Sequence, residues 1–162
     1  MNAIVAVSQN WAIGRDGKLL FRLSEDLKHF RSLTEGGTVI MGRKTLESLP
    51  KGQPLANRDN IILSAQPDIE VPGAAVVHSF DQALAMVQGR DRVFVIGGGS
   101  IYAKLLPYCQ RAYVTMVDAK ADADTYFPNL DRHPDWELFS ASEPVADNGY
   151  TFRYLEYVRK AG

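Results

Sequence analysis

The chain has 162 residues, of which 46% are apolar and 23% are charged, and these values are ordinary for a globular domain. With 18 basic and 19 acidic residues the formal net charge is −1, so no overall field favours nucleic acid or an anionic membrane. No apolar run approaches the roughly 20 residues of a membrane span. We therefore expect one domain over 1–162 that has neither nucleic acid nor a membrane as a partner.

Short β-branched runs alternate with helical segments along the first two thirds of the chain. The runs are nearly continuous in apolar character, as in strands that are buried on both faces. They cover 3–7, 38–41, 60–64, 74–77 and 93–96. Helices are expected over 24–33, 44–49, 80–87 and 100–108. The alternation predicts an α/β fold with a mostly parallel central sheet and about four helices on its two faces.

The carboxyl end differs from this pattern. The segments 111–119, 135–141 and 151–159 show partial period-two alternation without a helix between them. We expect them to add antiparallel strands at one edge of the sheet. Near the other end, 8–23 is long for a loop inside a compact domain, and long ordered loops often act as lids over a site.

Cys109 is the single cysteine, so the chain has neither an internal disulfide nor a cysteine-based zinc site. We expect Cys109 to be a packed small side chain rather than a nucleophile. The amino terminus lacks the basic region and apolar core of a secretory signal, which favours a cytoplasmic location. The three histidines show no metal-ligand spacing, so we expect no metal.

Three consecutive glycines, Gly97, Gly98 and Gly99, follow the run 93–96 and open an expected helix. Glycine permits positive φ and the close approach of a ligand, and the first amides of a helix attract an anion. The dinucleotide fingerprint needs a further glycine that this segment lacks. The glycines alone leave ligand binding and a tight turn both open.

Two other expected strands also end in polar segments. Arg43 and Lys44 begin a helix, where cations oppose the helix dipole but suit a phosphate ligand; a solvated basic loop explains them equally well. Ser64 and Gln66 lie at the carboxyl end of the run 60–64 and offer neutral donors. Ligands of open α/β sheets bind beyond the carboxyl ends of the strands, and all three segments lie there.

Asp26 lies in the first turn of the first expected helix, for which Ser24 is a good N-cap. It borders an apolar stripe formed by Leu23, Leu27, Phe30 and Leu33. The carboxylate either complements the helix dipole or faces an apolar pocket, and the residues alone do not decide between these.

Five motifs taken in order closely resemble dihydrofolate reductase of the bacterial chromosomal type. They are "AIVAVSQNWAIGRDGKLLFRLSEDLKHF", "VIMGRKTLESL", "RDNIILSAQ", "VFVIGGGSIYAKLLP" and "DADTYFP". The similarity runs collinearly from Ala3 to about Arg159. It implies NADPH-dependent reduction of 7,8-dihydrofolate to 5,6,7,8-tetrahydrofolate for one-carbon metabolism. Hydride reaches pterin carbon 6 and nitrogen 5 is protonated. It also implies binding of antifolate inhibitors, and we expect a monomer.

On the substrate side, the resemblance implies that Asp26 accepts hydrogen bonds from the pterin 2-amino group and ring nitrogen 3, supported by the hydroxyl of Thr115. Phe21 stands where most bacterial members have a tryptophan that holds an ordered water, and a phenylalanine cannot donate. We expect these three residues to be catalytic. Arg58 pairs with the α-carboxylate of the glutamate tail. The remaining substrate-binding residues are Ile4, Val5, Ala6, Leu27, Phe30, Leu49, Leu55 and Ile96.

On the cofactor side, the resemblance places the 2′-phosphate of NADPH near Arg43 and Ser64 and the pyrophosphate near Lys44 and Thr45. It also implies a cis peptide between Gly97 and Gly98. The loop around 13–19 closes over the nicotinamide. The cofactor-binding set is Ala6, Ile13, Gly14, Gly17, Lys18, Leu19, Gly42, Arg43, Lys44, Thr45, Leu63, Ser64, Ala65, Gln66, His78, Ile96, Gly97, Gly98, Gly99, Ser100, Ile101 and Tyr102.

Two other functions remain open at this point. A pyrimidine reductase of riboflavin synthesis shares the fold and the use of NADPH, but not the helix motif around Asp26 or Arg58 in this register. A non-catalytic NADPH- or folate-binding module would retain the fold without the reaction. A domain cut from a fusion with thymidylate synthase is not expected.

Overall fold

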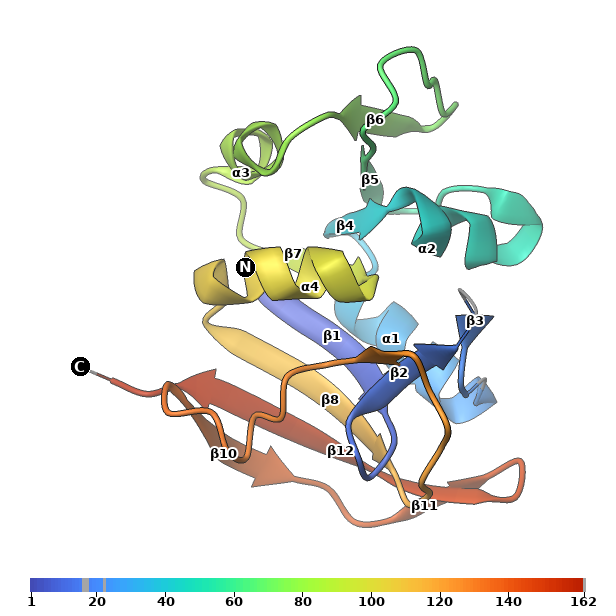
Figure 1. Ribbon diagram of the computed structural model, residues 1–162, viewed down its shortest axis with the longest axis vertical. Coiled ribbons are helices and arrows are strands. Elements are labelled where there is room, and N and C mark those ends of the chain that lie inside the picture. The colour runs from blue at the N-terminus through green and yellow to red at the C-terminus, as the bar shows by residue number, and fades with distance from the viewer. Residues whose placement is uncertain (16–17, 22, 162) are drawn as a thin grey trace.

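The structure is a computed structural model that describes residues 1–15, 18–21 and 23–161, with the backbone alone for Lys18 and Leu19. Within these residues, nine strands form the main sheet, in the order β10, β12, β8, β1, β7, β4, β5, β6, with β11 paired to β12 (Figure 1). Their bounds are β1 (Asn2–Val7), β4 (Thr38–Gly42), β5 (Asp59–Leu63), β6 (Ala74–Val77), β7 (Val93–Gly97), β8 (Arg111–Val117), β10 (Trp136–Ala141), β11 (Val145–Asp147) and β12 (Tyr150–Arg159).

The sheet is parallel from β8 to β6 and antiparallel beyond β8. This confirms the predicted α/β fold with a mostly parallel sheet and antiparallel strands at the carboxyl end. The expectation that 111–119 is an antiparallel addition is wrong for β8, which pairs in parallel with β1. Period-two alternation indicates that one face of a strand is more exposed than the other, but it does not indicate the direction of the strand relative to its neighbours. The antiparallel strand at the edge is β10, and β12 lies inside it.

Four helices cover the two faces of the sheet in pairs. They are α1 (Ser24–Thr34), α2 (Arg43–Ser48), α3 (Phe80–Val87) and α4 (Gly99–Leu105), and short 3-10 turns follow at Pro50–Gly52 and Leu106–Tyr108. Alternate strand residues face opposite ways. Ile4, Val39 and Phe94 pack with residues of α1 and α2, whereas Val5 and Val95 pack with residues of α3 and α4. The predicted coverage of both faces is therefore confirmed.

The described residues of 8–23 include two short strands where we expected a loop. They are β2 (Ala12–Arg15) and β3 (Lys18–Leu19), which form a small sheet with β9 (Thr125–Tyr126). The amide of Asp124 donates to the carbonyl of Gly14 at 3.1 Å, and the amide of Phe127 donates to the carbonyl of Trp11 at 2.9 Å. Trp11 is buried and stacks on Phe127. These contacts fix one side of the segment to the chain around 124–127.

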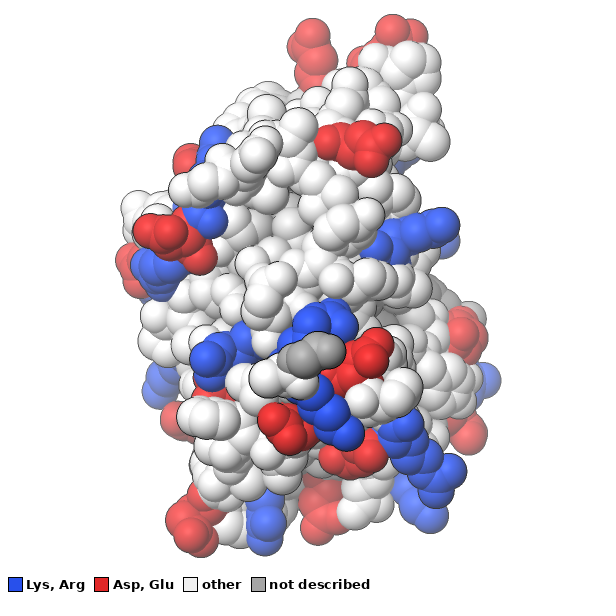
Figure 2. Space-filling model, turned by 90° about the vertical axis from the view of Figure 1, so that its left-hand side faces the viewer, with Lys and Arg blue, Asp and Glu red and all other residues white. Residues whose placement is uncertain are grey.

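Cys109 is fully buried, and burial raises the pKa of its thiol to about 12. The prediction of a packed cysteine is confirmed. Basic and acidic side chains are intermingled on the face shown in Figure 2, in keeping with a net charge near zero. Among the described residues, no helix is long and apolar enough to cross a membrane.

Candidate active site

The carboxyl ends of the parallel strands lie side by side at one edge of the sheet. Met41 pairs with Gly97, Gly42 with Leu63, and Leu63 with Val77. The segments that continue from these ends contain most of the predicted cofactor residues, in 42–45, 63–66, 78 and 96–102. The fold thus brings together three segments that are far apart in the sequence.

Each glycine of the run 97–99 has a different environment. Gly97 has φ +130°, and a Cβ built there would lie 3.1 Å from Thr45 Oγ1. A Cβ on Gly99 would lie 2.5 Å from Thr125 Cγ2, which is closer than real Cβ atoms approach. A Cβ on Gly98 would meet only Thr45 Oγ1 at an ordinary 3.7 Å. The Gly97–Gly98 peptide is cis, as the resemblance implies. Packing inside the protein explains Gly97 and Gly99 but leaves room beside Gly98, which fits a ligand that approaches the backbone there.

The polar residues of the second and third segments are adjacent. Ser64 is buried and its hydroxyl accepts a hydrogen bond from the amide of Gln66 at 3.2 Å. The Nδ1 atom of His78 lies 2.9 Å from the carbonyl oxygen of Ser64. Arg43 and Ser64 follow the paired residues Gly42 and Leu63, so they extend from neighbouring strands. Arg43 is partly exposed and pairs with Glu47 at 3.0 Å. This group supplies neutral donors and a cation, as a phosphate requires.

Asp26 of α1 is held by the side chain of Thr115 in β8, the strand next to β1. The hydroxyl of Thr115, which is buried in β8, donates to Asp26 Oδ1 at 2.6 Å. Burial of Asp26 raises the pKa of its carboxyl, while the bond from Thr115 and the nearby imidazole of His29 act in the opposite direction. A desolvated carboxylate with one fixed donor is well suited to accept hydrogen bonds from a ligand.

Ser24 does not cap α1 as predicted. Leu23 occupies the N-cap position and makes no side-chain hydrogen bond. Ser24 lies inside the first turn, where its hydroxyl donates to Asp147 Oδ2 at 3.1 Å. The same oxygen accepts from the amide of Glu25 at 3.1 Å. The carboxylate of Asp147, at the end of β11, thus satisfies the helix amide that a local cap would otherwise bind.

Five of the predicted substrate residues contact one apolar cluster on the side of the sheet covered by α1 and α2. They are Ile4, Phe30, Leu49, Leu55 and Ile96. The structure does not bring the side chain of Val5 to this group, because it belongs to the cluster on the opposite face. Leu27 is 59% exposed, so it lies at an open side of the group rather than in the core.

Ala6 and Arg58 lie at two borders of this apolar cluster. Ala6 pairs with Thr115 in register, which brings β1 next to the Asp26 contact. Arg58 lies above the ring of Phe30, with the guanidinium carbon 6.0 Å from the ring centre. It donates from Nη1 to Thr34 Oγ1 at 3.1 Å and from Nε to the carbonyl of Ala56 at 2.9 Å. These bonds hold the planar guanidinium in one orientation.

Tyr102 connects α4, which follows the glycine run 97–99, to β1. Its hydroxyl donates to the carbonyl of Ile4 at 2.6 Å, and its ring packs edge-on against Phe127. Ile13 is buried in the same cluster as Tyr102. The ring of Phe21 contacts that of Tyr150 with centroids 5.3 Å apart, and Phe21 packs against the cluster of Leu23, Val117 and Phe152. Gly17 lies outside the described residues, as do the side chains of Lys18 and Leu19.

Two residues near Asp26 were not predicted. Tyr154 of β12 pairs in register with Thr115, and its hydroxyl donates to the carbonyl of Glu25 at 3.2 Å. The ring of His29, which lies one turn after Asp26, stacks on the ring of Tyr154. The spacing of three residues from Asp26 was a visible signal for His29, but nothing local in the sequence indicates the register that places Tyr154 there.

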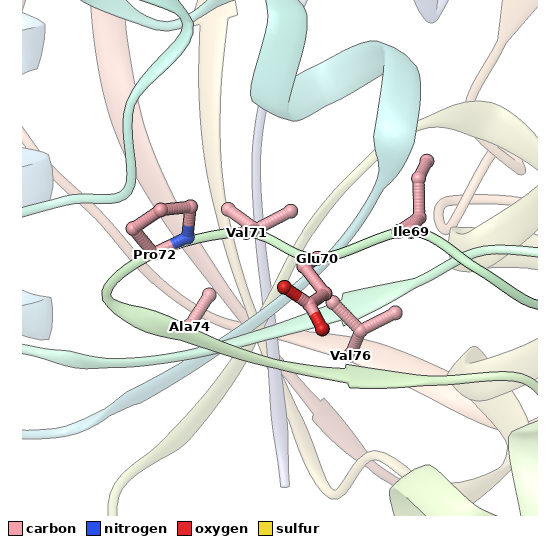
Figure 3. A pocket seen from close by; sticks show the side chains of 6 residues that line it. All are labelled: Ile69, Glu70, Val71, Pro72, Ala74 and Val76. Atoms are coloured by element: carbon pink, nitrogen blue, oxygen red, sulfur yellow. The ribbon is translucent and has the colours of Figure 1, made fainter.

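A shallow hollow of about 300 Å³ lies beside the edge strand β6 (Figure 3). It is lined by Ile69, Glu70, Val71, Pro72, Ala74 and Val76. None of the predicted site residues lines it. Among the described residues, no three His, Cys, Asp or Glu side chains are placed to hold a metal ion.

Comparisons with known proteins agree with this geometry. The family model described as dihydrofolate reductase matches residues 1–159. Dihydrofolate reductase of Bacillus subtilis (strain 168) is 39% identical over 97% of this chain and 93% of its own length. That of Haemophilus influenzae is 40% identical over 97% of both chains. A structure of dihydrofolate reductase from Enterococcus faecalis complexed with NADP(H) and RAB-propyl superimposes with a TM-score of 0.88 at 35% identity, covering 99% of this chain and 96% of the other.

The chain therefore belongs to the dihydrofolate reductase family. This membership confirms the resemblance drawn from the five motifs. The pyrimidine reductase of riboflavin synthesis is not favoured.

Proposed function

We infer that this chain is an NADPH-dependent dihydrofolate reductase that converts 7,8-dihydrofolate to 5,6,7,8-tetrahydrofolate. The observation that carries this inference is the bond of 2.6 Å between Thr115 and the desolvated carboxyl of Asp26. Phe30, one turn after Asp26, packs in the apolar cluster. Thr115 pairs with Ala6 of β1, and Tyr102 of α4 bonds to Ile4 of the same strand. Membership of the family supports the same reaction.

Asp26 binds and orients the pterin ring. One carboxyl oxygen is occupied by Thr115, and the carboxylate accepts from the pterin 2-amino group and ring nitrogen 3. Ile4, Phe30 and Ile96, with Leu49 and Leu55, pack against the pterin and benzoyl rings. Leu27, which is 59% exposed, covers the open side of these rings. Backbone atoms of Val5 and Ala6 complete this wall.

The oriented guanidinium of Arg58 binds the α-carboxylate of the glutamate tail. Its Nε and Nη1 atoms are already bonded to Ala56 and Thr34, so little side-chain freedom is lost when the carboxylate binds. Burial slightly disfavours the charged form of Arg58 and lowers the pKa of its guanidinium. A carboxylate ligand offsets this cost by pairing with the charge.

The strand ends fit NADPH, which supplies the hydride when it is bound. Arg43, Ser64, Gln66 and His78 bind the 2′-phosphate. Lys44, Thr45 and the backbone of 98–101 bind the pyrophosphate, and Tyr102 lies at the nicotinamide end. Ser100 replaces a frequently basic residue of the family, so Arg43 carries more of the phosphate charge.

The chain also controls water and protons. Pterin nitrogen 5 must gain a proton, while water must be excluded from carbon 6, which accepts the hydride. Asp26 polarises the pterin from the side of the 2-amino group and nitrogen 3, away from nitrogen 5. The segment that includes β2 and β3 covers the nicotinamide side of the site. Phe21 offers no N–H to hold an ordered water, so an indole-bound water is not part of this site. We further propose that the protein acts as a single cytoplasmic domain and as a monomer, and that it binds antifolate inhibitors.

The loss of near-ultraviolet NADPH absorbance, followed with and without dihydrofolate, tests this function. We expect a loss that requires dihydrofolate and is blocked by methotrexate. Asp26→Asn should reduce turnover by orders of magnitude near neutral pH and leave NADPH binding intact. If NADPH binds but no dihydrofolate-dependent loss occurs, the protein is a binding module and the assignment of the reaction fails. Near-normal turnover in the Asn variant would remove Asp26 from the mechanism.

A further inference from the structure

The strand β12 makes a second set of contacts to the helix turn that carries Asp26. Tyr154 stands directly opposite Thr115 in the antiparallel ladder, so both side chains reach the same face of the sheet. Thr115 binds the Asp26 carboxyl, and Tyr154 binds the carbonyl of the preceding residue, Glu25. The two neighbouring strands thus hold adjacent residues of one helical turn.

The ring of Tyr154 also holds His29. The two rings are stacked with centroids 3.8 Å apart and an interplanar angle of 24°. His29 follows Asp26 by three residues, a spacing that places both side chains on one side of the helix. Both residues are partly buried. An imidazole is therefore fixed beside the carboxylate that binds the pterin, and stacking limits its rotation away from that carboxylate.

Several other charged groups surround this turn. Glu25 and Lys28 of α1 pair with each other at 3.4 Å. Asp147 receives hydrogen bonds from the start of the helix. Tyr154 carries a phenol whose pKa is raised, mainly by burial and then by the charge of Asp26, so it stays neutral in the physiological range. Glu25, Lys28 and Asp147 are either paired or bonded to the backbone. His29 is an imidazole, the side chain most easily moved between charged and neutral forms, and burial lowers its pKa from the ordinary value while the charge of Asp26 opposes this.

We propose that His29 is a positioning residue for Asp26, which is held in place by the ring of Tyr154 and sets the pH range over which Asp26 binds the pterin as a carboxylate. This proposal rests on the proposed role of Asp26 in substrate binding. His29 does not contact the reacting atoms; it acts through the charge on Asp26.

The direction of the coupling follows from the charges. A protonated imidazole stabilises the neighbouring carboxylate, which lowers the pKa of Asp26 against the effect of burial. In return, the carboxylate raises the pKa of His29, whereas burial lowers it. The two effects are reciprocal because they are the same interaction free energy. Removing either charge must therefore move the titration of the other.

His29→Phe removes the charge and keeps an aromatic ring against Tyr154. We expect the acid limb of the pH profile of the KM for dihydrofolate to move to higher pH, by on the order of half a pH unit for two charges one helical turn apart in a water-like dielectric. The KM for NADPH should not change. His133→Phe is the matched control, since His133 contacts the backbone of Asp135 instead, and it should leave the profile unchanged. An unmoved acid limb in His29→Phe would overturn the proposal.

A second measurement does not depend on activity. The imidazole resonances of the three histidines can be followed by NMR over pH and assigned with the two Phe variants. In Asp26→Asn, the midpoint of His29 should fall while those of His78 and His133 stay the same. Equal His29 midpoints in the two proteins would refute the coupling even if the enzyme is active. Conversely, a coupled His29 in a protein that does not reduce dihydrofolate would reject the proposed reaction and leave the coupling established.

Discussion

Gly99 offers a sharp test of how the small sheet packs against the start of α4. A Cβ at this position would lie 2.5 Å from the Cγ2 methyl of Thr125 in β9, and the next neighbour, Ile13 Cδ1, is at 4.0 Å. Ordinary contact begins near 3.4 Å. In Gly99→Ala, the helix and β9 must therefore separate by about 0.9 Å along this direction, because both contacting atoms lie close to the backbone.

The cost of this separation outweighs the intrinsic gain of alanine. Overpacking costs about 1–3 kcal/mol, whereas replacing a helical glycine with alanine contributes about 0.5–1 kcal/mol in favour of folding. We expect a net loss of about 1–2 kcal/mol. For a chain of this size, each kcal/mol corresponds to about 2–4 °C in Tm. Thermal unfolding followed by circular dichroism should therefore show Gly99→Ala melting about 2–8 °C lower.

Thr125→Ser removes the clashing methyl and retains the hydroxyl that donates to Asp124 Oδ1 at 2.9 Å. In this background, Gly99→Ala should be neutral or stabilising, and the double-mutant cycle should give a coupling of at least about 1 kcal/mol. An equal loss of Tm in both backgrounds would show that the contact with Thr125 does not determine the cost, and the reasoning about this packing would fail.

Three further outcomes are expected. Because burial raises the pKa of Asp26, its charge destabilises the fold above that pKa. Asp26→Asn should melt higher than the unchanged protein at neutral pH, by a few °C for about 1–2 kcal/mol, and the difference should vanish as the pH falls toward 3.8; an equal difference at every pH would contradict this. Arg43→Ala should raise the KM for NADPH about tenfold or more, the scale of one charge-assisted hydrogen bond, and leave that for NADH unchanged in parallel assays. Cys109 should react with a thiol reagent only when the protein is unfolded in denaturant, because it is buried and its pKa is about 12.

The parallel half of the fold was predictable because its signals are local. Runs such as 93–96 are apolar without alternation, and only strands covered on both faces can bury such runs. The helix over Phe80–Val87 has the predicted bounds because Ser79 caps it locally, accepting from the amide of Gln82. The expected helix 100–108 changes to a 3-10 turn at Leu106, where Pro107 removes a backbone donor.

The errors arise where a distant segment replaces a local interaction. Ser24 is a good capping residue by type, but Asp147 reaches the helix start from more than a hundred residues away. The direction of β8 and the position of Tyr154 depend on strand pairing, which leaves no mark on the residues themselves. The ring contact of Phe21 with Tyr150 of β12 depends on the same strand pairing, and the catalytic role expected for Phe21 stays a prediction. Predicting these contacts would have required knowledge of which strands pair and in which register.

The change of strand direction between β8 and β12 separates the two halves of the proposed site. On the parallel side, strand ends at Gly42, Leu63 and Gly97 align and expose backbone amides and glycines, which suits a phosphate-bearing cofactor. On the antiparallel side, strands pass the site with their side chains. Thr115 pairs with Ala6 of β1 on one side and with Tyr154 of β12 on the other. The groups that reach α1 are therefore the side-chain hydroxyls of Thr115 and Tyr154, not the ends of strands. In the proposed function, the cofactor therefore binds at strand ends and the residues that follow them, whereas the pterin binds beside strands that present the side chains of Thr115 and Tyr154 to α1. Substitutions at Thr115 or Tyr154 should accordingly change the pH dependence of substrate binding and leave cofactor affinity unchanged.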